Sequence, residues 1–198
     1  MRVEIAFRVY LEQDRDRLNY SEPITGGKYS VPSPIRMAGI YPDGGVTLIS
    51  CHFHPPGTLL IPSYEDLRLL RRYNLYQHVS GVRILDILGL ANHEDVELLM
   101  LQQTFTNKVN NLGGDPVHSS FHAKMLEKTF IRFYPDQSDV VEELVYLCNS
   151  ASDKNIARAK NLLPTDYAVI LAEELERTGL YKASYKSLKS EGGDKYGI

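Results

Sequence analysis

The chain has 198 residues, 43% of them hydrophobic and 24% charged, which is enough to bury the core of a globular protein. Its formal net charge of −3 argues against general electrostatic binding to nucleic acid or to an anionic membrane surface. Two cysteines are too few for a disulfide framework and fit a reducing cytosol. No uninterrupted apolar run typical of a signal peptide or membrane span is present. The sequence therefore predicts a cytoplasmic protein that has neither nucleic acid nor membrane as a partner.

The first half of the chain shows strand and helix patterns in alternation. Residues 3–11 alternate with a period of two, and the odd-numbered positions are the apolar ones, which predicts a half-buried strand. Residues 46–54 are apolar on both faces, which is typical of a central strand. Helical spacing covers residues 63–78, and the run from residue 80 to 90 predicts the next strand. In that helix Leu67, Leu70 and Tyr73 are expected to face inward, and Arg68, Arg71 and Arg72 outward.

The second half is expected to be mainly helical. Residues 93–111 could form either a helix or a strand, because their apolar positions are too dense to settle the period. From residue 117 onward the spacing is helical, and the polar end, residues 187–198, is expected to fray. We therefore expect an α/β domain over residues 1–111 and a helical C-terminal extension over residues 112–198, which could belong to the same domain. The apolar stripes of these helices could also pack on another subunit in a homo- or hetero-oligomer.

The segment CHFHPPGTLLIPSYED, residues 51–66, contains a candidate metal site. His52 and His54 lie two positions apart on one strand, so both imidazoles point to the same side. Zinc binds histidine nitrogen and carboxylate oxygen, and Asp66 could complete a three-ligand set that leaves one position for water. A structural alternative needs no metal, because Ser63 followed by an acid three residues later is also typical of a helix capping box.

The pattern HFHP followed by PSYEDLRLL resembles the JAMM motif of the MPN (JAB) domain metalloproteases, whose form is H-x-H-P, a spacer and S-x-x-D. It is most similar to the bacterial RadC-like branch, in which a proline precedes the serine. The run GVRILDILGL also resembles the strand that follows the motif helix in that branch. The resemblance covers about residues 2–91 and implies an MPN-type fold, in which helices flank a curved mixed β-sheet.

This resemblance implies a zinc-dependent peptidase or isopeptidase. His52, His54 and Asp66 would be the zinc ligands, and Ser63 would help to stabilise the oxyanion. The family also needs an upstream glutamate as general acid and base; Glu4 is the first choice, Glu22 the second and Glu12 the third. The substrate would be a protein, such as the C-terminal tail of a ubiquitin-like protein bound along the sheet edge. A role in DNA metabolism, as in the RadC-like branch, is not favoured by the acidic net charge.

One departure from the motif leaves a second function open. Eight residues, Pro55 to Pro62, separate His54 from Ser63, which is one more than the family usually has. A loop can absorb an extra residue at little entropic cost, so the site could stay intact. The insertion could equally move Ser63 and Asp66 away from the metal. The chain would then be a catalytically silent MPN scaffold that binds a protein partner.

A second histidine pair lies in the C-terminal half. His118 and His122 are four residues apart, so on a helix they would share one face. They could bind a metal or help to complete the site at His52 and His54. The favoured interpretation is that they are surface or packing residues near a helix start.

Overall fold

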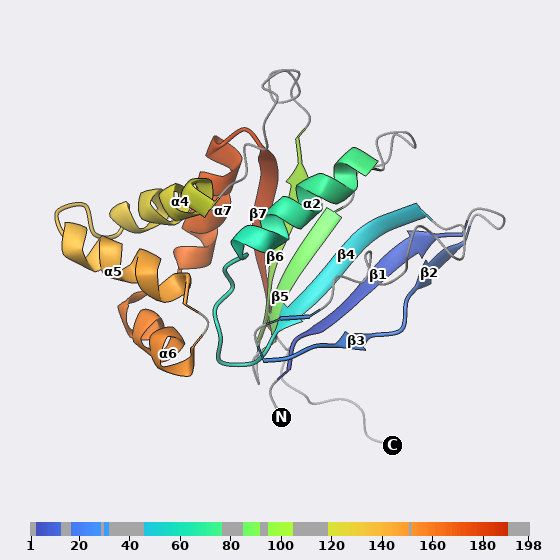
Figure 1. Ribbon diagram of the computed structural model, residues 1–198, viewed down its shortest axis with the longest axis horizontal. Coiled ribbons are helices and arrows are strands. Elements are labelled where there is room, and N and C mark those ends of the chain that lie inside the picture. Colours follow the sequence, from blue (N-terminus) through green and yellow to red (C-terminus); the bar gives the residue numbers. More distant parts are fainter. Residues whose placement is uncertain are drawn as a thin grey trace.

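The computed structural model describes residues 3–12, 17–28, 30–31, 46–76, 85–91, 95–104, 119–150 and 152–189. Within them the protein is an α/β fold built on an open, mixed sheet of seven strands (Figure 1). The strand order is β2-β1-β4-β5-β6-β7, and β3 pairs with β1 on the same side as β2. The pairing of β4 with β5 is parallel, whereas every other pairing is antiparallel. The bounds are β1 Ile5–Leu11, β2 Leu18–Tyr20, β3 Ile24–Thr25, β4 Val46–His54, β5 Leu85–Ala91, β6 Asp95–Gln103 and β7 Tyr181–Lys189.

Strand β1 forms as its period of two predicts, but the prediction that its odd-numbered apolar face is the buried one is wrong. Glu4, Ala6, Arg8 and Tyr10 are buried, while Phe7 and Val9 on the other face are half-buried. Arg8 on this buried face has partners for part of its side chain. Arg8 donates a hydrogen bond to the Thr47 hydroxyl at 3.0 Å, and its guanidinium lies over the Tyr10 ring. A polar group costs less free energy to bury when it is hydrogen-bonded. The face of β1 that is buried therefore depends on partners that are distant in sequence.

Helix α2 (Tyr64–Tyr76) connects the two parallel strands and crosses one face of the sheet (Figure 1). Leu67 and Leu70 face the core, as the helical spacing predicts. The expectation that Arg71 points outward is wrong, because only 7% of this residue is exposed. β5 follows as predicted from the apolar run. β6 settles the open choice for residues 93–111 in favour of a strand over Asp95–Gln103.

The second half of the chain packs on the same face of the sheet. It contains α4 (Ser119–Ile131), α5 (Ser138–Cys148), α6 (Asp153–Leu162) and α7 (Tyr167–Arg177). One hydrophobic cluster joins side chains from both sides of the expected boundary at residue 111, including Leu88, Leu99, Leu126 and Leu171. The helices therefore share one core with the sheet.

The C-terminal region is not only helical, and residues 187–189 of the tail expected to fray belong to a strand, while residues 190–198 lie outside the described residues. Residues 181–189 form β7, which pairs antiparallel with β6 along its whole length. Alternate residues Tyr181 and Tyr185 face the helices, and the Tyr181 hydroxyl donates to the Leu67 carbonyl at 3.1 Å. The exposed face of β7 is mainly polar, as is common for a strand with one face in solvent. From the sequence alone, such a strand is hard to distinguish from a solvated tail.

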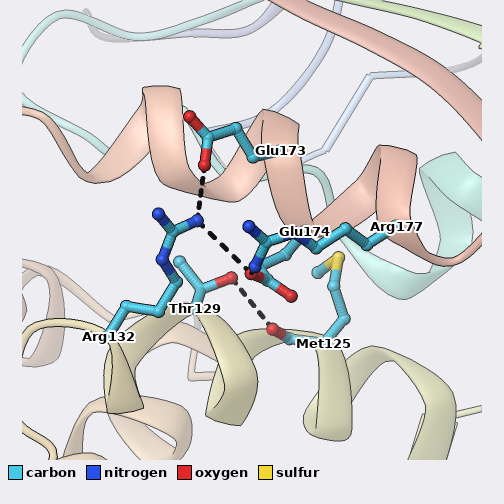
Figure 2. Close-up of polar contacts among 6 residues, drawn as sticks. All are labelled: Met125, Thr129, Arg132, Glu173, Glu174 and Arg177. Atoms are coloured by element: carbon cyan, nitrogen blue, oxygen red, sulfur yellow. Dashed lines mark hydrogen bonds and ion pairs between the residues drawn. The ribbon is translucent and has the colours of Figure 1, made fainter.

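A polar cluster ties α4 to α7 beside this core (Figure 2). Arg132, just after α4, pairs with Glu173 and Glu174 on α7, and Arg177 pairs with Glu174 from the same helix. The Glu174 side chain is 8% exposed, so two guanidinium groups balance a nearly buried carboxylate. Such pairing is the usual condition for burying a charge. The cluster links α7 to α4, whose residue His122 lines the cavity described below.

Gly89 on β5 leaves room for an aromatic side chain beside the histidine strand. A Cβ atom at this position would lie 2.2 Å from Cε1 of Phe53, the residue between His52 and His54. We expect Gly89→Ala to lower the free energy of unfolding by about 1–3 kcal/mol, because Phe53 must move. Urea denaturation measures this loss, and the double variant Phe53→Leu/Gly89→Ala should recover part of it. Wild-type stability for Gly89→Ala alone would contradict the packing.

No helix in the described ranges combines the length and apolar composition needed to cross a bilayer. His118 lies outside the described residues.

Candidate metal centre

Three potential metal ligands converge where β4 ends and α2 begins. The donor atoms of His52, His54 and Asp66 all lie within 4.8 Å of one another. The two imidazoles come from the C-terminal end of β4, and their ring centroids are 5.3 Å apart. Asp66 comes from the first turn of α2, which returns over the strand end. The structure thus brings together the three residues that the motif suggested, and the extra spacer residue does not separate them.

His52 has the environment of a metal ligand. Its Nε2 atom is buried and has no hydrogen-bond partner among the described residues. The nearest carboxylate oxygen, Oδ2 of Asp66, is 3.7 Å away, which is too long for a hydrogen bond. Burial lowers the pKa of His52, but the carboxylates of Asp66, Asp86 and Glu4 together raise it above its ordinary value. An unsatisfied buried nitrogen beside three acids suits a bound cation, so this donor set fits zinc.

His54 is held in the tautomer that a metal ligand needs. Its Nδ1 atom lies 2.7 Å from the Leu59 carbonyl oxygen. Because a carbonyl oxygen can only accept, Nδ1 carries the proton and Nε2 keeps its lone pair. Burial lowers the pKa of His54, which keeps the ring neutral. A backbone carbonyl in this role is typical of histidines that bind zinc.

Ser63 and Asp66 form a reciprocal capping box at the start of α2. The Ser63 amide donates to Oδ2 of Asp66 at 2.7 Å, and the Asp66 amide donates to the Ser63 hydroxyl oxygen at 3.2 Å. This is the helix cap that the sequence offered as the structural alternative. It is compatible with the metal site, because the same cap fixes the carboxylate of Asp66 within reach of His52.

Glu4 lies in the same cavity, just before β1. Backbone hydrogen bonds hold it on both sides, from its own amide to Gly27 and from the Gly26 amide to its carbonyl, each at 2.9 Å. On its other side Gly26 packs closely on the following loop, since a Cβ there would lie 2.1 Å from the Ser30 carbonyl oxygen. Burial raises the pKa of Glu4 to about 7, with His52 lowering it and Asp66 adding to the rise. A carboxyl group with this pKa can both accept and donate a proton near neutral pH.

The two other glutamates lie away from the cavity. Glu22 is exposed in the turn before β3, and it does not line the cavity. Glu12 follows the far end of β1, where its carboxylate accepts a hydrogen bond from Asn19 at 2.8 Å. Of the three glutamates considered, Glu4 is the one that lines the cavity.

Asp86 is a cavity residue that the motif did not indicate. It lies on β5 opposite Ser50, is 5% exposed, and is hydrogen-bonded to Ser50. Burial raises the pKa of Asp86 to about 6, and the charge of His52 opposes the rise. The sequence did carry a signal, because an acid inside the apolar run RILDILGL is seldom buried without a partner.

The cavity has a volume of about 500 Å³ and extends from the ligands to the C-terminal helices. Its polar end contains Glu4, the two histidines, Ser63 and the two aspartates; its apolar end includes Leu147 and Ile156. Cys51 is buried on the opposite face of β4, as expected, and burial raises its pKa to about 12. Neither cysteine belongs to the metal cluster among the described residues.

Comparison with protein-family models, with curated proteins and with solved structures gave no match. The interpretation of the site therefore rests on the motif and on the geometry of these side chains.

Proposed function

We propose that the protein is a zinc-dependent hydrolase of amide or isopeptide bonds, of the JAMM type. The convergence of three ligand donors within 4.8 Å, in a cavity that also contains a carboxyl group with a pKa of about 7, carries the proposal. His52, His54 and Asp66 would hold the metal. Zinc in such a site supplies Lewis-acid polarisation and makes water a competent nucleophile near neutral pH.

Residues around the ligands would carry out proton transfer and stabilise the charge that develops during the reaction. Ionised Glu4 accepts a proton from the attacking water as its oxygen bonds to the carbonyl carbon. The same carboxyl group then delivers that proton to the departing amine as the C–N bond breaks. The Ser63 hydroxyl donates a hydrogen bond to the oxygen on which negative charge develops.

The substrate that we propose is a protein with an extended C-terminal tail, such as a ubiquitin-like protein. Glu4 lies beside the pairing of β1 with β3, and β3 is only two residues long. An extended tail would bind by adding as a further strand at this edge of the sheet.

Hydrolysis of a ubiquitin-like fusion tests this function. The zinc-loaded protein should release the tail, lose activity after treatment with a chelator, and regain it when zinc is restored. A protein that binds zinc and cleaves neither a ubiquitin-like fusion nor an isopeptide-linked conjugate would contradict the assignment.

A catalytically silent scaffold is the second candidate. The capping box favours it, because Ser63 and Asp66 already satisfy one another at the start of α2 without a metal. In that case the purified protein should contain no zinc, and its melting temperature should not respond to added zinc.

Activity should rise with pH, because Glu4 acts as a base in its ionised form. Burial raises the pKa of Glu4 to about 7, so the ionised fraction grows as pH increases toward that value. A bound cation stabilises the ionised carboxylate and so lowers the pKa of Glu4. The rise of kcat/KM with pH should therefore have its midpoint at or below about pH 7. A profile from about pH 5 to 9 measures it, and a flat profile would exclude a base with this pKa.

A further inference from the structure

The segment between the two ligand-bearing elements is held by the C-terminal helices. Residues Pro55 to Pro62 link His54 to the start of α2 and pass beside α6 (Figure 1). Lys160 of α6 donates to the Gly57 carbonyl at 3.1 Å, and the Leu60 amide donates to the Tyr167 hydroxyl of α7 at 2.7 Å. A third contact comes from α4, where Nε2 of His122 lies 2.9 Å from the Pro62 carbonyl oxygen. Three helices therefore constrain the spacer that is longer than usual.

The contact from His122 is the one nearest to a metal ligand. Pro62 directly precedes Ser63, and its ring restricts its own backbone to one value of φ. Ser63 and Asp66 are joined by two hydrogen bonds, so they move together. A bond that fixes the Pro62 carbonyl therefore also limits where the Asp66 carboxylate can lie relative to His52.

The imidazole of His122 is itself rigidly oriented. The residue is 2% exposed, and Nδ1 lies 3.0 Å from Oδ1 of Asn149, just after α5. Asn149 is oriented in turn, because its amide nitrogen donates to the Val145 carbonyl at 2.8 Å. The Pro62 carbonyl oxygen and Oδ1 of Asn149 both only accept, so the ring donates to Pro62 in the tautomer with the proton on Nε2 and to Asn149 in the tautomer with the proton on Nδ1. Contacts on both nitrogens fix the plane of the buried ring.

We propose that His122 is a positioning residue for the metal centre, acting through the Pro62 carbonyl to hold Ser63 and Asp66 against His52 and His54. The inference rests on the proposed function of those three ligands. It assigns the C-terminal helices a role in the site: they compensate for the extra spacer residue by fixing the segment from outside.

Two substitutions at residue 122 separate positioning from packing. His122→Gln keeps an N–H group near the place of Nε2 and can still donate to Pro62. His122→Asn keeps a donor near the place of Nδ1, so it can reach Asn149 but not Pro62. Both remove the buried ring, and both should lower the melting temperature by similar amounts. Metal affinity should differ, with His122→Asn weaker by about tenfold and His122→Gln close to wild type.

The measurement is competition between the protein and a chromophoric chelator for Zn²⁺, repeated with Co²⁺. If both variants bind as tightly as wild type while melting earlier, His122 only packs and the inference is wrong. Should neither variant fold, Asn149→Ala provides the test, because Asn149 is exposed and its loss frees the ring. That variant should weaken zinc binding severalfold, and unchanged affinity would overturn the inference.

The outcomes also distinguish this inference from the proposed function. A wild-type protein that binds no zinc would contradict both. A wild-type protein that binds zinc, with no effect from any of the three variants, would contradict only the role of His122. Weakened binding in His122→Asn together with normal hydrolysis by Glu4→Gln would support the positioning role and contradict the proposed mechanism.

Discussion

Replacing Glu4 with glutamine should lower kcat by about 10²–10⁴-fold while the zinc content stays unchanged. Glutamine has nearly the same shape and can occupy the same place before β1, but its amide cannot accept the proton of the attacking water. The metal ligands are untouched, so binding of zinc and of substrate should persist. Steady-state hydrolysis of a ubiquitin-like fusion, with zinc measured on the same samples, provides the test.

The same substitution should have a recognisable effect on stability. The pKa of Glu4 is about 7 in the folded protein and near 4.5 when unfolded, so the folded state binds its proton more tightly. Ionisation of Glu4 therefore reduces stability as pH rises from about 4.5 to about 7. Glu4→Gln removes that loss, so the metal-free variant should gain stability over wild type at pH 8 and not at pH 4.

Glu22→Gln is the matched control, because Glu22 is exposed and lies outside the cavity lining. It should retain wild-type activity. Normal hydrolysis by Glu4→Gln together with loss of activity in Glu22→Gln would show that Glu22 is the base and that the cavity geometry has been misinterpreted.

Asp66→Asn should abolish stable zinc binding without disturbing the start of α2. The amide oxygen of asparagine can still accept the hydrogen bond from the Ser63 backbone, so the capping box is retained. The negative charge is lost, and a neutral amide is a poor ligand for zinc. We expect about one zinc per wild-type chain after dialysis against a weak chelator, and less than about a tenth of that in the variant.

Thermal unfolding gives an independent readout of the same change. A ligand that binds only the folded state stabilises it by about 2.7 kcal/mol at a concentration of 100 times Kd, so zinc should raise the melting temperature of wild type. Asp66→Asn should show no such rise, whereas Glu65→Gln, an exposed neighbour in the same helical turn, should behave as wild type. Equal zinc content in Asp66→Asn and wild type would remove Asp66 from the ligand set.

The parts of the site that the sequence predicted correctly are local. His52 and His54 are two positions apart on one strand, so their shared direction follows from the pleat alone. Ser63 and Asp66 are three positions apart at a helix start, where the cap and the placement of the acid follow from one turn. The α/β character and the helices of the second half follow in the same way from periodicity.

The parts that the sequence missed depend on contacts between distant segments. The buried face of β1 was assigned wrongly because Arg8 obtains its partner from Thr47, which is distant in sequence. The sequence does not predict β7, whose last three residues lie in the expected polar tail, because its partner strand β6 is distant in sequence. The acid inside the apolar run around Asp86 signals a buried group, but nothing local relates it to Ser50 or His52. The partners in each of these contacts follow only from the order of strands in the sheet.

X-ray absorption at the zinc edge tests the central claim most directly, because it reports the atoms that surround the metal. For the wild-type protein we predict two imidazole nitrogens and oxygen ligands, at about 2.0–2.2 Å, with no sulfur. In the Asp66→Asn variant at saturating zinc, the signal from the two imidazole nitrogens should remain. The signal from the oxygen ligands should become weaker and more disordered. A sulfur scatterer at about 2.3 Å would place Cys51 or Cys148 at the metal, and a third imidazole would place another histidine there. Either result would contradict a centre built from His52, His54 and Asp66.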